Sequence, residues 1–300
     1  MFARSAVIAG ALLVSGCVSN NPSASGPVPP TTISDFAAQC EAWDEWDKPA
    51  PPFHIYGSTF YVGTCGISAI LITGPDGHIL LDSGTDAGAQ VVLDNIATLG
   101  FDPDDVTYLL HSHEHFDHTG GHARIVEASG AAVIASRKSA EVLRTGISHR
   151  QDPQFGMHDA MAPVAVAREV SSGDRIETAA ATLIAHETPG HSPGALSWSW
   201  EECAPNDGCK VIVYADSLSP VSADSYRFSA NPNYLAAYRE GLERLAALEC
   251  DILLTPHPSH SKMVERAGTG SFTGGVTCAD YAAGKTRDLD ARLGKEAARQ

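Results

Sequence analysis

Apolar residues recur along the chain with two different periods, which predicts that strands and helices alternate. Residues 60–82 contain two apolar runs rich in β-branched side chains on either side of a Gly-Pro-Asp-Gly segment, and this pattern predicts a β-hairpin. Residues 86–99 and 233–248 carry apolar side chains at helical spacing. Because hairpins come first and strands later alternate with helices, we expect an α/β fold, an αββα sandwich of two sheets between outer helices.

Shorter segments extend this prediction along the chain. Strands are expected at residues 106–110, 131–135, 182–186, 195–200, 211–215 and 251–255, and one more helix at residues 138–144. Residues 111–121 are predicted to form a polar loop. The sequence contains no internal repeat and no second linker, so residues 33–300 are expected to form one domain.

The N-terminus is typical of an export signal. Arg4 precedes an apolar run that is too short to span a bilayer as a permanent helix. The run ends in Val-Ser-Gly-Cys17, which resembles the bacterial lipobox, so residues 1–16 are predicted to be a lipoprotein-type signal peptide and Cys17 to be lipidated. Cleavage after a small residue further on is the alternative. Residues 17–32, rich in Ser, Asn, Pro and Gly, are predicted to be a flexible tether.

Export and charge together limit the partners. The mature chain is expected in the periplasm of a Gram-negative bacterium, either free or as an outer-membrane lipoprotein anchored through Cys17. A formal net charge of −16 disfavours nucleic acid as a partner, because a phosphate backbone would be repelled. The expected partner is a small molecule, and the protein is expected to be a monomer.

An oxidising compartment favours disulfides, which changes the interpretation of the cysteines. Six of them remain besides Cys17, and the sequence alone does not fix their connectivity. Cys203 and Cys209 flank a turn between two strand-like runs and are natural partners across a hairpin. The expected pairs are Cys40 with Cys65, Cys203 with Cys209, and Cys250 with Cys278.

Four histidines and an aspartate lie within the eight residues 111–118. Buried together without a cation they would leave several polar groups unpaired, whereas zinc accepts imidazole nitrogen and carboxylate oxygen as ligands. If the chain is extended here, His113 and His115 point the same way. A tighter turn through Asp117 and His118 can aim those two side chains at a neighbouring cation, so two metal ions fit the pattern better than one.

The sequence HxHxDH formed by these residues resembles the signature of the metallo-β-lactamase superfamily. Two further histidines, in HETPGHSPGALSW and LLTPHPS, follow predicted strands in the order that the family shows. The likeness spans residues 53–278 and implies the metallo-β-lactamase fold with two Zn²⁺ ions per chain. The implied ligands are His113, His115 and His191 for the first zinc, and Asp117, His118 and His257 for the second.

Within this superfamily the chain resembles the subclass B3 β-lactamases, because residues 213–219 lack the cysteine that subclass B1 uses at the second zinc. The resemblance implies that Ser217 orients a water, that Ser217 and Ser219 contact the substrate carboxylate, and that Tyr226 lies near the carbonyl oxygen. Asp117 would be the catalytic residue, accepting a hydrogen bond from the attacking hydroxide. The implied reaction is zinc-dependent hydrolysis of the β-lactam amide bond of penicillins, cephalosporins and carbapenems by a metal-bound hydroxide, which confers antibiotic resistance.

The superfamily hosts many reactions on one fold, so other functions stay open. The main alternative is a thioesterase or lactonase, either glyoxalase-like or an acyl-homoserine-lactone hydrolase. Those relatives carry an aspartate that bridges both metals just after a strand, and Asp216 could take that place. Export and the B3-like segments YVGTCGISAILI and YADSLSPVSADSYRF favour the lactamase. A non-catalytic zinc lipoprotein is disfavoured, because an open cluster with two metals is not a closed structural site.

Two serine motifs do not predict a serine enzyme. GxSxG at residues 190–194 precedes a strand rather than a helix, and SxxK at residues 259–262 lacks its companion motifs. Residues 151–155 form a polar loop that could overhang the site. Beside the ligands, His111 and His122 are candidate outer hydrogen-bond donors and His186 a brace for the loop of His191. Packing is expected for Trp198 and Trp200, and surface or loop positions for His54, His78, His149, His158 and His260.

Overall fold

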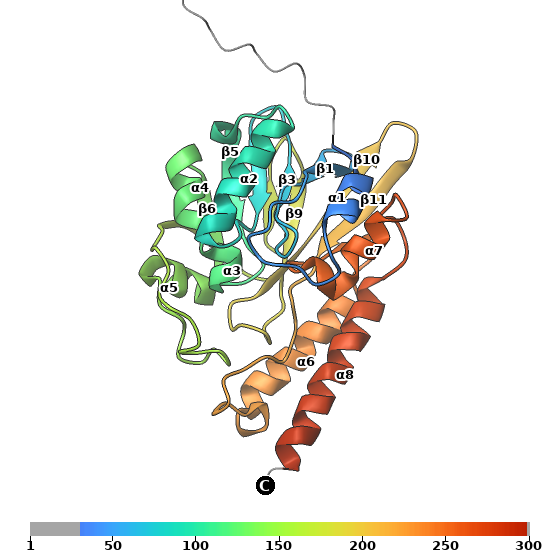
Figure 1. Ribbon diagram of the computed structural model, residues 1–300. Helices are drawn as coiled ribbons and strands as arrows, with labels where there is room; N and C mark the ends of the chain where they lie inside the picture. Colours follow the sequence, from blue (N-terminus) through green and yellow to red (C-terminus); the bar gives the residue numbers. More distant parts are fainter. Residues whose placement is uncertain (1–30, 299–300) are drawn as a thin grey trace, which may run out of the picture.

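Two mixed sheets lie face to face in the computed structural model, which describes residues 31–298 (Figure 1). The first sheet has seven strands in sequence order, antiparallel from β1 to β4 and parallel from β4 to β7. Its strands are β1 (Phe53–Tyr56), β2 (Thr59–Tyr61), β3 (Ile70–Ile72), β4 (His78–Leu81), β5 (Val106–Leu110), β6 (Ala132–Ser136) and β7 (Val166–Val170).

The second sheet has five strands in the order β12-β11-β10-β9-β8, all antiparallel except the β11–β12 pair. Its strands are β8 (Arg175–Glu177), β9 (Thr182–Glu187), β10 (Leu196–Ala204), β11 (Gly208–Tyr214) and β12 (Ile252–Leu254). The long β10–β11 hairpin pairs Trp198 with Tyr214 and Cys203 with Cys209. β9, β11 and β12 therefore run in one direction and end at the same edge.

Helices cover the outer face of each sheet, which confirms the predicted sandwich. The helices on the first sheet are α2 (Asp86–Thr98), α4 (His122–Ser129) and α5 (Arg137–Thr145), and those on the second are α6 (Pro232–Ala246) and α8 (Cys278–Ala297). Helices α1 (Ile33–Gln39) and α7 (Met263–Ala267) pack at the seam between the sheets. Shorter elements are α3 (Phe116–Thr119) and the 3-10 turns Pro103–Asp105, Phe228–Ala230 and Pro258–Ser261.

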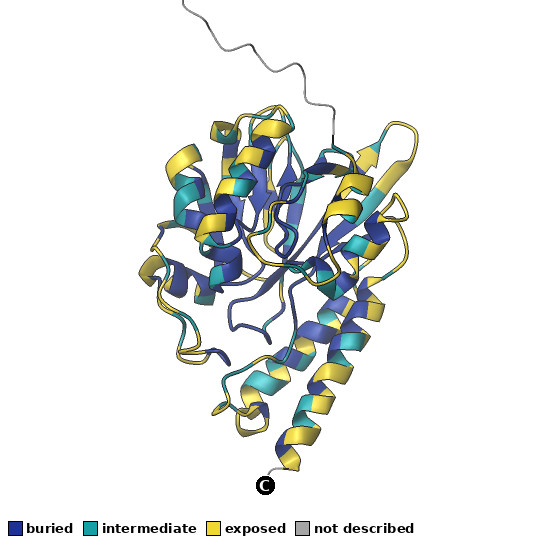
Figure 2. Ribbon diagram, in the orientation of Figure 1, coloured by how far each residue is buried: buried dark blue, intermediate teal, exposed yellow. Residues whose placement is uncertain are grey.

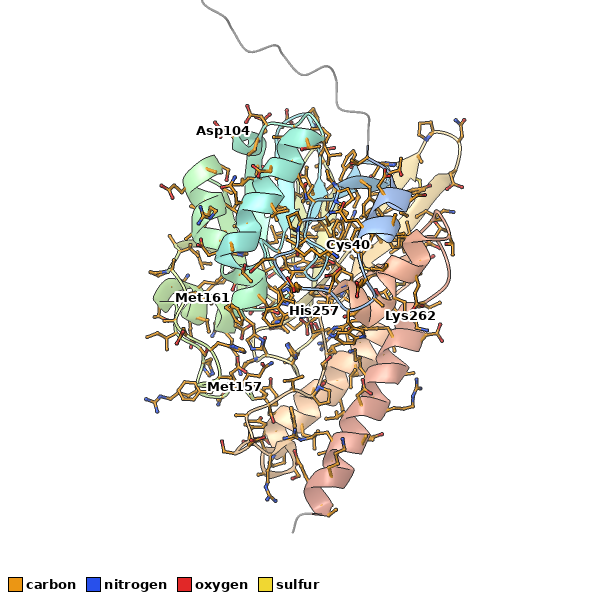
Figure 3. The ribbon with its side chains drawn as sticks, viewed as in Figure 1. Cys40, Asp104, Met157, Met161, His257 and Lys262 are labelled. Carbon is orange, nitrogen blue, oxygen red and sulfur yellow. A yellow bond between two sulfur atoms is a disulfide. The ribbon has the colours of Figure 1, made fainter. Side chains whose placement is uncertain are left out.

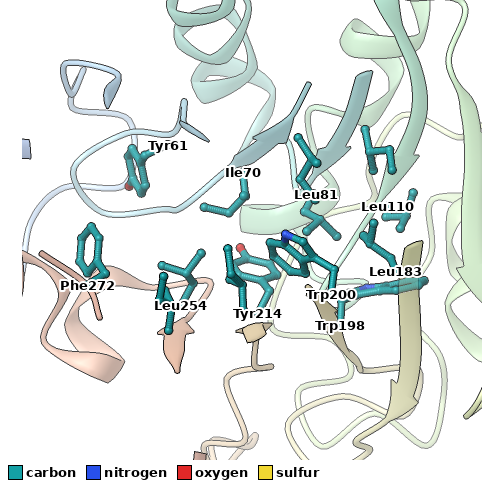
Figure 4. Close-up of a cluster of buried hydrophobic side chains, with 14 of the residues drawn as sticks. Tyr61, Ile70, Leu81, Leu110, Leu183, Trp198, Trp200, Tyr214, Leu254 and Phe272 are labelled. Atoms are coloured by element: carbon teal, nitrogen blue, oxygen red, sulfur yellow. The ribbon is translucent and has the colours of Figure 1, made fainter. Parts of the chain in front are cut away.

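The core fills the space between the two sheets. Leu81 and Leu110 of the first sheet face Trp198 and Tyr214 of the second, and all four side chains are buried (Figure 4). The sheets and the inward faces of α6 and α8 are buried while the outward faces of these helices are exposed (Figure 2). Burying a large apolar side chain stabilises a protein by about 1.5–3 kcal/mol, so this seam holds the sheets together. The predicted packing role of Trp198 and Trp200 is confirmed.

The structure also contains elements that the apolar pattern did not predict. These are α1, β1, β2, α4, β7, β8, α7 and α8, together with the one-turn helix α3 inside the predicted polar loop. Helix α8 begins with a capping box formed by Thr277 and Asp280, a local signal that identifies its start. Its capping sequence is more informative than its apolar pattern, because most of its apolar residues are alanines interspersed with charged residues.

The cysteines pair as expected, with bonds between Cys40 and Cys65, Cys203 and Cys209, and Cys250 and Cys278. The predicted signal peptide and Cys17 lie outside the described residues. Within residues 31–298, no helix combines the length and the hydropathy needed to cross a bilayer.

Candidate metal centre and its cleft

The predicted metal ligands follow the carboxyl ends of strands at one edge of the two sheets. The loop after β5 supplies His113, His115, Asp117 and His118, the loop after β9 supplies His191, and the loop after β12 supplies His257. Two hydrogen bonds join the sheets beside these loops. The backbone N–H of Leu196 donates to the carbonyl of Ser112 at 2.7 Å, and the Trp198 indole donates to the carbonyl of His111 at 2.9 Å.

Three imidazoles form the first cluster. The ligand nitrogens of His113, His115 and His191 all lie within 4.8 Å of one another, and their ring centroids are 4.7–4.9 Å apart. All three rings are buried. His113 and His115 point the same way, as the extended spacing predicts, while Glu114 between them reaches Ser192 on the other side of the loop.

Each of these rings has one nitrogen held by a partner outside the cluster. The contacts are Asp216 Oδ1 to His113 Nδ1 at 2.8 Å, Asp152 Oδ2 to His115 Nε2 at 2.8 Å, and His191 Nδ1 donating to the Ser219 carbonyl at 2.9 Å. Such partners fix the tautomer and orientation of metal-binding histidines. The remaining nitrogen of each ring faces the cluster, and Nε2 of His113 is buried with no hydrogen-bond partner among the described residues.

The second cluster brings together one carboxylate and two imidazoles. Nε2 of His118 lies 3.3 Å from Nε2 of His257, and Oδ2 of Asp117 lies 3.1 and 3.2 Å from these two nitrogens. Ligands of a tetrahedral zinc ion, each about 2.0–2.1 Å from the metal, are about 3.3 Å apart. The three atoms therefore already have the separation expected for ligands of one cation.

Burial and nearby charges perturb the titration of both clusters. Burial would lower the pKa of His118, but the carboxylates of Asp117 and Asp82 outweigh it and raise that pKa to about 10. Burial would raise the pKa of Asp117, but His118 and His257 hold it well below its usual value. Burial lowers the pKa of His113 well below its usual value. The local field of Asp82 and Asp117 thus favours a cation, and a neutral His113 can bind a metal.

The residues of both clusters fit a metal ion. The donors are imidazole nitrogens and a carboxylate oxygen, the set that zinc accepts. Nε2 of His113 has no other partner, and the second cluster has the spacing of a ligand set. A metal site explains both features, whereas a hydrogen-bonded polar core would leave Nε2 of His113 unpaired at a cost of about 1–3 kcal/mol.

An open cleft of about 450 Å³ gives access to both clusters. Four predicted ligands line it, namely His115, Asp117, His191 and His257. Figure 3 labels His257 near the middle of the molecule and Met157, also a lining residue, on the loop below it. The exposed rings of Trp43 and Trp46 stand at its rim, and that of Trp46 is 6.0 Å from the His257 ring.

The loop after α5 overhangs this cleft, as predicted for residues 151–155. Asp152 holds His115, and Nε2 of Gln154 lies 3.3 Å from Nε2 of His191. His158 also lines the cleft. The sequence did not indicate these contacts, because they join residues 37 positions apart.

Four predicted positions are corrected or refined by the structure. His158 and His260, expected to be ordinary surface or loop residues, both line the cleft. His186 does not brace the loop of His191. Its Nε2 instead shares a hydrogen bond of 2.8 Å with the Ser199 hydroxyl on the neighbouring strand. His122 faces Ser83, whose hydroxyl also donates to the backbone of His118, so it supports the ligand segment indirectly.

The predicted substrate residues do not all lie together. Ser219 lines the cleft, and Ser217 is buried behind it with a side-chain oxygen that has no partner among the described residues. Tyr226 instead lines a larger cavity of about 1000 Å³ between α5 and α6, which contains none of the predicted ligands. Ser192 of the GxSxG motif is buried and donates to Glu114, a contact unlike that of a nucleophile.

Comparison with known proteins agrees with this architecture. The family model described as the metallo-β-lactamase superfamily matches residues 62–257. Similar structures include the MIM-2 metallo-β-lactamase, 52% identical with a TM-score of 0.85, covering 88% of this chain and 98% of that one. MIM-1 from Novosphingobium pentaromativorans is 44% identical with a TM-score of 0.85, covering 89% and 99%. MEM-A1, a subclass B3 metallo-β-lactamase isolated from a soil metagenome library, is 39% identical with a TM-score of 0.82, covering 85% and 100%.

The chain therefore belongs to the metallo-β-lactamase superfamily. Its structural neighbours include subclass B3 members, which confirms the resemblance seen in the sequence.

Matches to curated proteins are shorter. Hydroxyacylglutathione hydrolase of Rhodospirillum rubrum is 30% identical over 114 residues, 38% of this chain and 36% of that protein. N-acyl homoserine lactonase AttM of Rhizobium radiobacter is 37% identical over 81 residues, 20% of this chain and 31% of that protein. The chain spans about a third to a half of the length of the first curated relatives it matches, so their whole activities are not carried over from this likeness.

Proposed function

We propose that this protein is a zinc-dependent hydrolase of the β-lactam amide bond, acting on penicillins, cephalosporins and carbapenems. The observation that carries the proposal is the pair of three-ligand clusters beside one open cleft, in a chain 52% identical to the MIM-2 metallo-β-lactamase over 98% of that protein. The first metal would be held by His113, His115 and His191, and the second by Asp117, His118 and His257.

Two bound zinc ions would supply a hydroxide nucleophile at neutral pH and a Lewis acid for the lactam carbonyl. The chain's own residues orient the reactants. Asp117 stays ionised because His118 and His257 hold its pKa well below its usual value, so its carboxylate can accept a hydrogen bond from the attacking water. Ser219, which lines the cleft, would contact the substrate carboxylate, and Ser217, which is buried behind it, would orient a water. The cleft admits one small molecule.

The position of Asp216 supports the lactamase over a thioesterase or lactonase. Those alternatives need an aspartate bridging the two metals, yet Oδ1 of Asp216 lies 2.8 Å from Nδ1 of His113, the nitrogen that faces away from the cluster. Oδ2 accepts from the backbone N–H of Leu218 at 3.1 Å. Both oxygens are thus engaged behind the ligands rather than between them.

The setting of the reaction is part of the proposal. Residues 1–16 would direct export, Cys17 would carry a lipid, and the domain at residues 33–300 would act in the periplasm. Hydrolysis there would intercept a β-lactam before it reached the cell wall and so confer resistance. The partial matches to hydroxyacylglutathione hydrolase and N-acyl homoserine lactonase define the control substrates.

The test measures hydrolysis of imipenem, S-lactoylglutathione and an acyl-homoserine lactone by the purified protein, with metal content determined in parallel. We expect imipenem to be opened, activity to disappear with a chelator and return with zinc, and His113→Ala and His257→Ala to be inactive. Efficient turnover of either control substrate without opening of imipenem would overturn the proposal. So would full activity in folded protein that contains no transition metal.

A further inference from the structure

A buried lysine lies directly behind the cleft. Lys285 is on α8, is only 8% exposed, and its ammonium donates to the hydroxyl of Ser219 at 2.8 Å. Ser219 itself is half-buried and lines the cleft. The Ser219 hydroxyl therefore separates a buried positive charge from the space where a substrate would bind.

This ammonium has no anionic partner within the described part of the chain. No carboxylate there lies within ion-pairing distance of Nζ, and the carboxylates that influence it are Asp216, whose oxygens face His113 and Leu218, and Asp288, which is exposed on the same helix. The Tyr281 ring lies 5.2 Å from Nζ. Burying an unpaired charge is costly, so a retained buried ammonium indicates that an anion binds nearby.

Within the described part of the chain, no lysine or arginine side chain is free at the cleft wall. The residues that line it include no lysine or arginine, and Lys48 near its rim is paired with Asp44 at 2.8 Å. His260 is the neighbouring titratable group on the lining, and burial keeps its pKa well below its usual value. Besides the metal ions of the proposed function, the positive side chain that an anionic substrate would meet here is therefore Lys285, through Ser219.

The segment that carries Ser219 is held firmly in place. Tyr281, one helical turn before Lys285, donates to the carbonyl of Ser217 at 2.7 Å, and Tyr238 of α6 donates to the carbonyl of Leu218 at 2.6 Å. Leu218 has a positive φ of 46°, a backbone conformation that costs about 1–3 kcal/mol and persists only where contacts enforce it. These contacts aim Ser219 at the cleft.

We propose that Lys285 is the charged anchor for the carboxylate of an anionic lactam, acting through the Ser219 hydroxyl that it polarises. This inference rests on the proposed function. It adds the residue that would make the enzyme prefer lactams with a free carboxylate over their esters. A hydroxyl that accepts a hydrogen bond from an ammonium becomes a stronger donor. The Ser219 hydroxyl donates to the Ser217 carbonyl at 3.3 Å, and its proton would rotate from this long contact toward a bound carboxylate. Burial lowers the pKa of Lys285 to about 8, which leaves the ammonium as the major form at pH 7.

The experiment compares a penicillin with its methyl ester on wild type, Lys285→Met and Lys285→Arg, with zinc content and circular dichroism as controls. Lys295→Met is the matched variant, because Lys295 is exposed on the same helix. A hydrogen bond to a charged group is worth about 10- to 100-fold in binding, so Lys285→Met should raise KM for the acid by about that factor. We expect kcat to change little, the ester to be unaffected, and Lys285→Arg to recover part of the loss.

The inference is overturned if folded, zinc-replete Lys285→Met keeps the wild-type ratio of acid to ester. Should Lys285→Met not fold, Lys285→Arg is compared with wild type instead, and equal KM values of wild type for acid and ester would still overturn the inference. Failure of the proposed function gives a different result, in which wild type opens neither acid nor ester. A loss of kcat for acid and ester alike would indicate a merely structural role for Lys285 and would also overturn the inference.

Discussion

Replacing Glu114 by alanine should destabilise the protein and loosen one metal cluster more than the other. Glu114 lies between two predicted ligands of the first cluster, but its side chain points away from them and is 2% exposed. Its carboxylate accepts hydrogen bonds from Ser192 Oγ at 2.7 Å, Ser139 Oγ at 2.9 Å and the Gly194 N–H at 2.9 Å. It thereby ties the loop after β5 to the loop that carries His191.

The expected loss of unfolding free energy follows from the hydrogen-bond donors that would lose the Glu114 carboxylate. Ser139 has a second acceptor in the carbonyl of Gly194 at 3.0 Å, whereas Ser192 Oγ and the Gly194 N–H have no other side-chain acceptor among the described residues. Each buried donor left unsatisfied costs about 1–3 kcal/mol, so Glu114→Ala should lower the free energy of unfolding by about 2–6 kcal/mol. Glu114→Gln keeps one acceptor oxygen and should lose less.

The assay is urea unfolding of metal-free protein, so that bound metal does not mask the change, followed by zinc titration of the folded variant. Glu127→Ala is the control, because Glu127 is exposed on α4. Zinc affinity of the cluster that contains His191 should fall, while that of the cluster containing His257 should stay near wild type. An unfolding free energy within about 0.5 kcal/mol of wild type, the usual effect of surface substitutions, would refute the reasoning.

Three further predictions concern other parts of the fold. Asp216→Asn should weaken zinc binding about 10- to 100-fold by disturbing His113 while leaving two metals per chain at saturating zinc, and loss of a metal at saturation would contradict this position. Burial would raise the pKa of Glu296, but hydrogen bonds from Ser229, Phe228 and Arg292 lower it to about 2 from 4.5. The stability it adds is present above about pH 4.5 and is lost as pH falls toward 2, so wild type should exceed Glu296→Gln by up to about 3 kcal/mol at pH 7, with the gap closing in acid unfolding curves. Opening the Cys250–Cys278 bond, which spans 28 residues, by a double serine substitution should lower the free energy of unfolding by about 3.5 kcal/mol in urea, and an unchanged midpoint would argue against the pairing.

The ligand segment could be predicted from sequence because its geometry is local. His113, His115, Asp117 and His118 follow a strand within eight residues, and the alternation of an extended chain fixes which side chains point together. The outer partners of these ligands could not be predicted in the same way. Asp216 is 103 positions from His113, and only the packing of the two sheets brings them to 2.8 Å.

The position of Lys285 behind the cleft could not be predicted from the sequence either, because it also depends on contacts between distant residues. The apolar pattern did not predict helix α8, because most of its apolar residues are alanines interspersed with charged residues; the signal in its sequence is the capping box of Thr277 and Asp280. A lysine in such a helix is usually solvated. Its burial depends on which face of α8 packs behind Ser219, and that follows from the contact of Tyr281 with Ser217, which is 64 positions away.

Each predicted metal site takes its ligands from loops of both sheets, so bound metal would contribute to the stability of the contact between the sheets. The first sheet supplies two ligands of each cluster, whereas the second sheet supplies only His191 and His257. Of the three disulfides in the described residues, none joins a strand of one sheet to a strand of the other. Bound metal would therefore add to the apolar seam and to the contacts of Glu114 and Asp216 in linking the two sheets at the site. Binding at 100 times its dissociation constant stabilises the folded state by about 2.7 kcal/mol per site, so chelation should loosen the two halves at the cleft before it unfolds the core.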